Sequence, residues 1–91
     1  MATQYTGTVL LEDSHGGEAG AVAAISDLDS DAWIGEVDIS AGRKWEPGPM
    51  TVCLLESRRA GEVARAQADG PPERRPVLLR GLSRFGIALG Q

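Results

Sequence analysis

The 91-residue chain has little of the residue types that form covalent cross-links and metal sites. It contains one cysteine, Cys53, and one histidine, His15. A single cysteine excludes a disulfide within the chain, and structural zinc sites need four Cys or His ligands. His15 stands beside Asp13 and Ser14 in a glycine-rich segment, where three neighbours rarely converge as a catalytic triad must. We interpret that segment as a polar turn and expect no metal and no cofactor.

Aromatic residues and long apolar runs are scarce as well. Four aromatic side chains are too few for the stacking platforms that bind single-stranded nucleic acid. No stretch approaches the roughly 18 apolar residues of a membrane-spanning helix. The first residues lack the basic region and apolar run of a secretory signal. We therefore expect a cytoplasmic protein that neither enters membranes nor binds nucleic acid.

The net charge of −4 is unevenly distributed along the chain. Residues 1–50 carry nine acidic and two basic residues, whereas residues 51–91 carry seven arginines and four acidic residues. Such asymmetry can produce a basic binding face, or the two halves can lie side by side and neutralise each other. The overall acidity argues against a nucleic-acid partner.

Alternation of apolar and polar residues predicts short β-strands. In residues 4–12 the residues Tyr5, Val9 and Leu11 share one face, and residues 32–40 alternate equally clearly. Residues 20–28 are predicted to form another strand, which a turn connects to the next. Residues 50–57 are apolar on both faces, which is typical of a central strand covered on both sides and makes Cys53 a small buried hydrophobe.

The segments near the C-terminus are less regular. Residues 58–69 contain good helix formers, but Gly61 would cost a helix about 1 kcal/mol relative to Ala. We favour a hairpin, with a turn at Arg59-Ala60-Gly61 and a returning strand over 62–69. A strand is also predicted over 77–89, with a bulge at Gly81. That bulge would bring the following five apolar residues to the core: Val77, Leu79, Leu82, Phe85 and Ile87.

These segments add up to one small, mainly β domain spanning residues 1–91. We predict a six-stranded antiparallel barrel or sandwich. The alternative is an α+β fold with a helix at about 58–69. No linker divides the chain.

One acidic segment resembles the start of a calcium-binding loop, because Asp27, Asp29 and Asp31 occupy alternate positions. Ala32 stands where such a loop needs glycine, and Asp38 replaces the longer bidentate glutamate. We interpret the segment as an acidic β-turn.

The candidate ligand- or partner-binding residues are two arginines, one glutamate and two tryptophans. Arg80 and Arg84 carry guanidinium groups that suit a carboxylate or phosphate, or they pair across strands with acids such as Glu36. Trp45, in a polar loop, would serve as a lid or as a partner contact. The predicted site therefore comprises Trp33, Trp45, Arg80, Arg84 and Glu36, with no catalytic residue among them.

Four short motifs resemble those of a family of small actinobacterial all-β domains of unknown function, found alone or beside flavin-dependent monooxygenases. They are Tyr5-Thr-Gly7, Trp33-Ile-Gly35, Pro47-Gly48-Pro49 and Leu82-Ser-Arg-Phe85-Gly. The resemblance implies a compact β fold and an accessory role, and it supplies no catalytic residues.

The first functional hypothesis is a non-catalytic accessory or binding module that self-associates through unpaired strand edges and binds a protein partner or a small anionic or hydrophobic ligand. The absence of a paired acid and base favours it over an enzyme. The alternative is a small β-barrel cyclase or isomerase acting on a hydrophobic, natural-product-like substrate. Tyr5, Glu36 or Arg80 would then be its polar groups.

Overall fold

The computed structural model describes residues 4–14, 16–39, 47–56, 59–70 and 76–87. These ranges contain no α-helix, and hence none that could cross a membrane. They contain seven strands: β1 (Gln4–Asp13), β2 (Glu18–Ser26), β3 (Ile34–Ile39), β4 (Gly48–Leu54), β5 (Glu62–Asp69), β6 (Val77–Gly81) and β7 (Gly86–Ile87). The predicted mainly β fold is confirmed.

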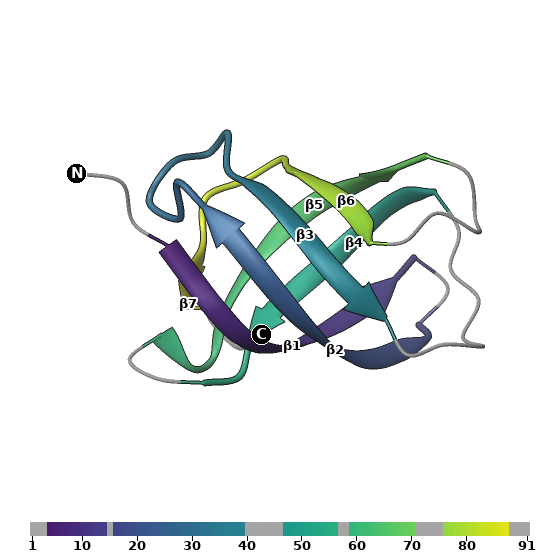
Figure 1. Ribbon diagram of the computed structural model, residues 1–91, viewed down its shortest axis with the longest axis horizontal. Coiled ribbons are helices and arrows are strands. Elements are labelled where there is room, and N and C mark those ends of the chain that lie inside the picture. Colours follow the sequence, from purple (N-terminus) through teal and green to yellow (C-terminus); the bar gives the residue numbers. More distant parts are fainter. Residues whose placement is uncertain (1–3, 15, 40–46, 57–58, 71–75, 88–91) are drawn as a thin grey trace.

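The sheet closes on itself (Figure 1). Around the barrel the order is β1, β2, β3, β6, β5, β4 and back to β1, and every neighbouring pair is antiparallel. Of the predicted six-stranded antiparallel barrel or sandwich, the structure shows the barrel, to which the short β7 is added on β5. Closure removes most of the free strand edges on which the self-association hypothesis relied. Among the described residues, those with a strand neighbour on one side alone include Gln4–Gly7 at the start of β1 and Ala64 and Arg65 within β5.

The hairpin over 58–69 is confirmed, and the alternative helix is wrong. The turn leads directly into β5, with Gly61 at a φ of 91°, a conformation that favours glycine. The Gly61 N–H donates a hydrogen bond to the Leu54 carbonyl at 2.8 Å, which closes the connection to β4.

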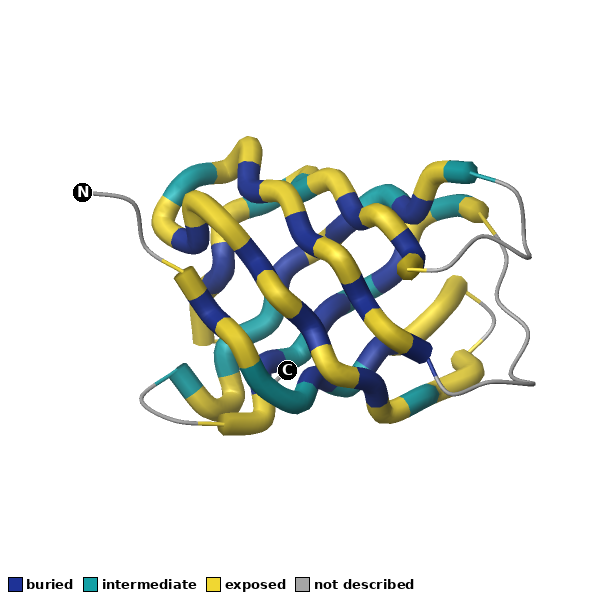
Figure 2. Tube along the Cα trace, in the orientation of Figure 1, coloured by how far each residue is buried: buried dark blue, intermediate teal, exposed yellow. Residues whose placement is uncertain are grey.

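Burial follows the predicted alternation along barrel strands such as β2 and β3, whereas both residues of β7 are exposed (Figure 2). A narrow barrel needs small residues as well as large ones in its interior. The three inward residues of β5 are all alanine, at positions 64, 66 and 68, and they leave room for Trp33 and the aliphatic side chains. The buried apolar residues are Tyr5, Val9, Leu11, Ala21, Ala23, Ile25, Leu28, Trp33, Val37, Ile39, Met50, Val52, Leu54, Ala64, Ala66, Ala68, Val77, Leu79 and Phe85.

Trp33 fills one end of the barrel. Its ring centroid lies 4.8 Å from that of Phe85, and its Nε1–H donates a hydrogen bond to the Ser83 carbonyl at 2.8 Å. The indole also lies against Gly81, where an added Cβ would come within 2.5 Å of the ring. Gly81 is therefore required for the packing of the tryptophan.

The predicted continuous strand over 77–89 is interrupted, because the chain bends around Trp33 after Gly81. The N–H groups of Leu82 and Ser83 both donate to the Arg65 carbonyl, at 2.8 and 3.3 Å. Phe85 turns inward, but Leu82 is 49% and Ile87 77% exposed. Their predicted place in the core is wrong, since a bend of several residues does not preserve strand alternation as a one-residue bulge does.

The prediction that β4 is covered on both faces is also wrong for the single chain. Its inward residues, Met50, Val52 and Leu54, are buried. On the outer face Cys53 is half-buried and Leu55 is exposed, because no second layer of described residues packs there. Cys53 is thus a surface residue rather than a core one.

Candidate functional site

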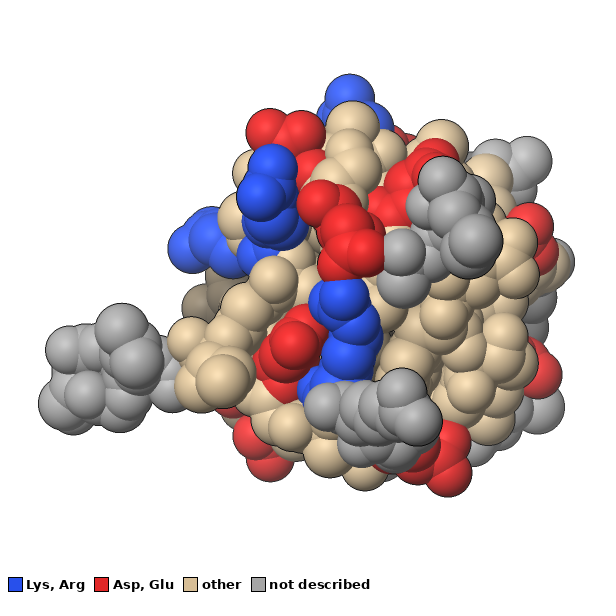
Figure 3. Space-filling view, turned by 90° about the vertical axis from the view of Figure 1, so that its left-hand side faces the viewer, with Lys and Arg blue, Asp and Glu red and all other residues tan. Residues whose placement is uncertain are grey.

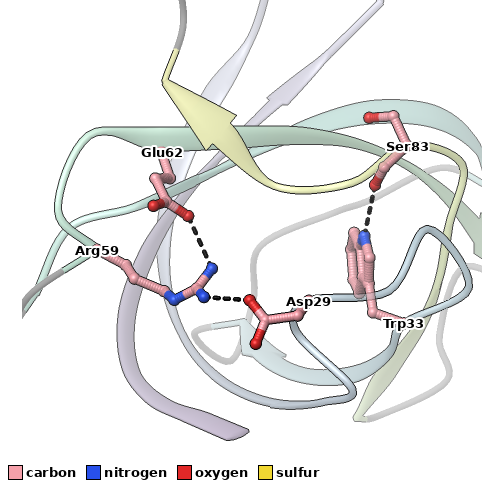
Figure 4. A network of polar contacts seen from close by, with 5 residues as sticks. All are labelled: Asp29, Trp33, Arg59, Glu62 and Ser83. Atoms are coloured by element: carbon pink, nitrogen blue, oxygen red, sulfur yellow. Dashed lines mark hydrogen bonds and ion pairs between the residues drawn. The ribbon is translucent and has the colours of Figure 1, made fainter. Parts of the chain in front are cut away.

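Polar side chains meet at the same end of the barrel as Trp33 (Figure 4). The loop between β2 and β3 supplies Asp29, and the connection between β4 and β5 supplies Arg59. The Arg59 guanidinium donates through Nη2 to Asp29 Oδ1 and through Nη1 to Glu62 Oε1, the latter at 3.0 Å. These three residues, here called the end cluster, join two connections that are 30 residues apart in the chain.

Local turn chemistry positions Asp29. Asp27 adopts a φ of 57°, which aspartate tolerates better than most residues, and its carbonyl accepts the Ser30 N–H at 2.9 Å. The Ser30 hydroxyl in turn accepts the Ala32 N–H at 3.0 Å. The segment is therefore an acidic turn, as predicted, whose central carboxylate binds an arginine. Among the described residues no group of three or more His, Cys, Asp or Glu side chains could hold a metal ion.

The end cluster contains two acids, Asp29 and Glu62, for one cation, Arg59. Partial burial acts to lower the pKa of Arg59, but the hydrogen bond to Asp29 and the charges of Glu62 and Asp29 outweigh it and raise the pKa above its ordinary value. Figure 3 looks onto this end of the barrel and shows acidic and basic atoms next to each other across its centre. Arg59 is therefore held as a permanent cation between two acids, and it links the loop between β2 and β3 to the start of β5.

A second set of polar contacts, which we call the seam, connects Tyr5 and Thr8 of β1 to Glu56, where β1 extends beyond β4. The Tyr5 hydroxyl donates to the Thr8 carbonyl at 2.8 Å and accepts the Glu56 N–H at 3.0 Å. The Glu56 carboxylate accepts the Thr8 N–H at 2.6 Å and lies directly over Gly7, where a Cβ would collide with it. Tyr5 thus uses both its donor and its acceptor within the fold.

The structure separates the residues of the predicted binding site. Trp33 lies in the interior, whereas Glu36 and Arg80 are exposed on the outer faces of β3 and β6. Arg80 pairs in register with Ile34, so Glu36 is its diagonal neighbour, and Arg80 Nε lies 3.7 Å from Asp69 Oδ2. The alternative of cross-strand charge pairing therefore describes Arg80, with Asp69 as its ion-pair partner.

Arg84 is exposed in the bend between β6 and β7. Trp45 and His15 lie outside the described residues.

Sequence reasoning missed the end cluster and an apolar feature on the outside of the barrel. Leu10, Cys53 and Val63 are paired in register across β1, β4 and β5, and their side chains point outward. All three are half-buried, and we call them the outer strip. The signal was present in the sequence, because Leu10 breaks the polar face of its strand and β4 is apolar on both faces.

No protein-family model matches the chain, and no curated protein or solved structure matches it either.

Proposed function

We propose that this protein is a non-catalytic binding module that acts through the outer wall of its barrel and associates with a copy of itself. The observation that carries the proposal is the number of large apolar side chains outside a closed barrel. Val22 and Ile34 are 56% and 59% exposed, and Leu55 is 44% exposed beside the half-buried outer strip. Val22 and Ile34 have polar neighbours such as Asp38 and Ser26. Apolar side chains that lie next to one another, as Leu55 and the outer strip do, favour an interaction surface.

The polar groups support binding over catalysis. A general acid or base must be free to approach a substrate atom. Arg59 is occupied by Asp29 and Glu62, and the Tyr5 hydroxyl is occupied by backbone groups. Both sets of contacts hold the fold together.

A cyclase or isomerase would need an internal cavity for its substrate. An eight-stranded barrel has an interior just wide enough for its own side chains, and six strands enclose less. Because Trp33 and other buried apolar residues occupy this interior, we favour the outer wall as the working surface. An anionic ligand at Arg80 would have to compete with Asp69. The accessory role and cytoplasmic location expected from the sequence belong to this proposal and stay predictions.

The proposal is tested by sedimentation velocity and size-exclusion chromatography with light scattering, over a protein series from about 1 μM to 1 mM. We expect the average mass to rise from that of one chain toward that of two. A mass that stays at one chain at every concentration would contradict self-association.

A further inference from the structure

We propose that the outer strip is the centre of a symmetric dimer interface in which the two-fold axis runs roughly along β4 and passes at Cys53. This inference rests on the proposed self-association and names the surface, the occupant and the symmetry.

The outer strip continues beyond its three side chains. In the same register row, Leu10 pairs with Gly20 of β2, and Val63 pairs with Gly86 of β7. Both glycines are exposed and have nothing within 4 Å of an added Cβ. A strip with side chains at its centre and bare backbone at its ends lets another backbone approach closely.

A neighbouring row of residues indicates what covers the strip. Glu12, Thr51 and Arg65 are paired in register across β1, β4 and β5 and point outward like the strip. Glu12 and Arg65 are exposed, and neither side chain makes an ion pair with a described residue. The row therefore presents a negative charge on one side of β4 and a positive charge on the other.

A two-fold axis along β4 exchanges the β1 side of the interface with the β5 side. Glu12 of one copy then faces Arg65 of the other, and the reverse pair forms at the same time. In the strip row, Leu10 faces Val63 of the second copy, and Cys53 faces Cys53 at the axis. A two-fold axis across the strands would instead place Glu12 opposite Thr8 of the second copy, which offers no charge. The charge pattern thus selects the second copy and its orientation.

The distribution of apolar residues along β4 agrees with a second copy packed on its outer face. The strand is apolar on both faces, as strands covered on both sides are, yet the single chain covers only the inner face. Two sheets packed about 10 Å apart would provide the missing layer over Cys53 and Leu55.

A charge-swap experiment tests the proposal in the full chain. Glu12→Arg alone places two arginines opposite each other at both pair positions, and Arg65→Glu alone places two glutamates there. We expect each single variant to raise the dimer dissociation constant at least about tenfold. The double variant E12R/R65E restores both pairs in reversed polarity, and we expect its dissociation constant to return to within about threefold of wild type.

One control makes the same charge change as Glu12→Arg away from the strip. Asp38→Arg lies on the outer face of β3, which does not neighbour β1, β4 or β5 and lies opposite β4 in the order of strands around the barrel. It should leave the dissociation constant within about threefold of wild type, and circular dichroism should show a β fold for all four variants.

The outcomes separate this inference from the proposed function. A wild-type dimer that the single variants do not weaken, or that E12R/R65E does not restore, would place the interface elsewhere and overturn the inference while self-association stands. A wild-type protein that is monomeric throughout would overturn both, and the outer strip would then belong to a different partner or to none.

Discussion

Replacing Gly81 by alanine tests the packing at the end of the barrel most directly. The new Cβ would lie 2.5 Å from both Cδ1 and Nε1 of Trp33 and 2.7 Å from Cε2. The indole has little room to retreat, because it is fully buried, packs on Phe85 and is hydrogen-bonded to Ser83. Either the ring or the β6 backbone must shift.

The expected loss of stability follows from two contributions. Overpacking of a dense core costs about 1–3 kcal/mol, and weakening the Trp33–Ser83 hydrogen bond costs about 1 kcal/mol more. We therefore expect G81A to lower the free energy of unfolding by about 3 kcal/mol, measured by urea denaturation at a concentration where the protein is monomeric. For a domain of this size, that is a large part of a total of about 5–15 kcal/mol.

A matched control and a double-mutant cycle make the experiment decisive. Gly86→Ala adds the same methyl group where nothing lies within 4 Å, so it should change stability by less than about 0.5 kcal/mol. Trp33→Phe removes Nε1 and the indole Cε2, two of the three atoms that the new Cβ would meet, and leaves a smaller ring. The double variant W33F/G81A should therefore lose clearly less than the sum of the two single losses. Strict additivity, or a G81A protein as stable as wild type, would refute the packing argument.

Three further predictions concern the end cluster, the seam and the bend. Arg59→Ala should lower the free energy of unfolding by about 1 kcal/mol, since both ion pairs are partly exposed. The pKa of Arg59 is raised, so the contribution of its charge is lost only at strongly alkaline pH, and the loss measured by urea titration should be the same from about pH 6 to 9. A steep change in that loss within this pH range would contradict the end cluster as described. Tyr5→Phe leaves the Thr8 carbonyl and the Glu56 N–H without their partner and should cost about 1–3 kcal/mol, whereas an unchanged urea midpoint would show that water replaces the hydroxyl at no cost. Leu82→Ser should change the free energy of unfolding by less than about 0.5 kcal/mol, whereas Phe85→Ala should lower it by about 3–5 kcal/mol. Equal losses of stability in thermal melts would show that Leu82 belongs to the core after all.

Several features of the fold could be predicted because they depend on neighbouring residues alone. Strand alternation placed Tyr5, Val9 and Leu11 on the buried face of β1, as the structure has them. Gly61 marked the hairpin between β4 and β5, because glycine adopts the positive φ of the turn without strain. The acidic turn from Asp27 was predicted in the same way, from side chains that bond to their own backbone.

The candidate site was predicted less well. Arg80 and Glu36 were correctly assigned to strands, but sequence spacing does not reveal that the acid 3.7 Å from Arg80 is Asp69. The end cluster escaped prediction because Asp29 and Arg59 come from separate connections. Leu82 and Ile87 were assigned to the core because a one-residue bulge was assumed where the chain makes a longer bend.

By itself, the sequence determined which side of most strands faces the core and where the tight turns fall. Side chains alternate along an extended chain and glycine has its own conformational range, so both properties are local. Only the tertiary structure decided the order of strands around the barrel, the contact of Gly81 with Trp33 and the alignment of Leu10, Cys53 and Val63 into one outer row. Each of these depends on the register between strands far apart in the chain, which is set when the whole sheet closes around its core.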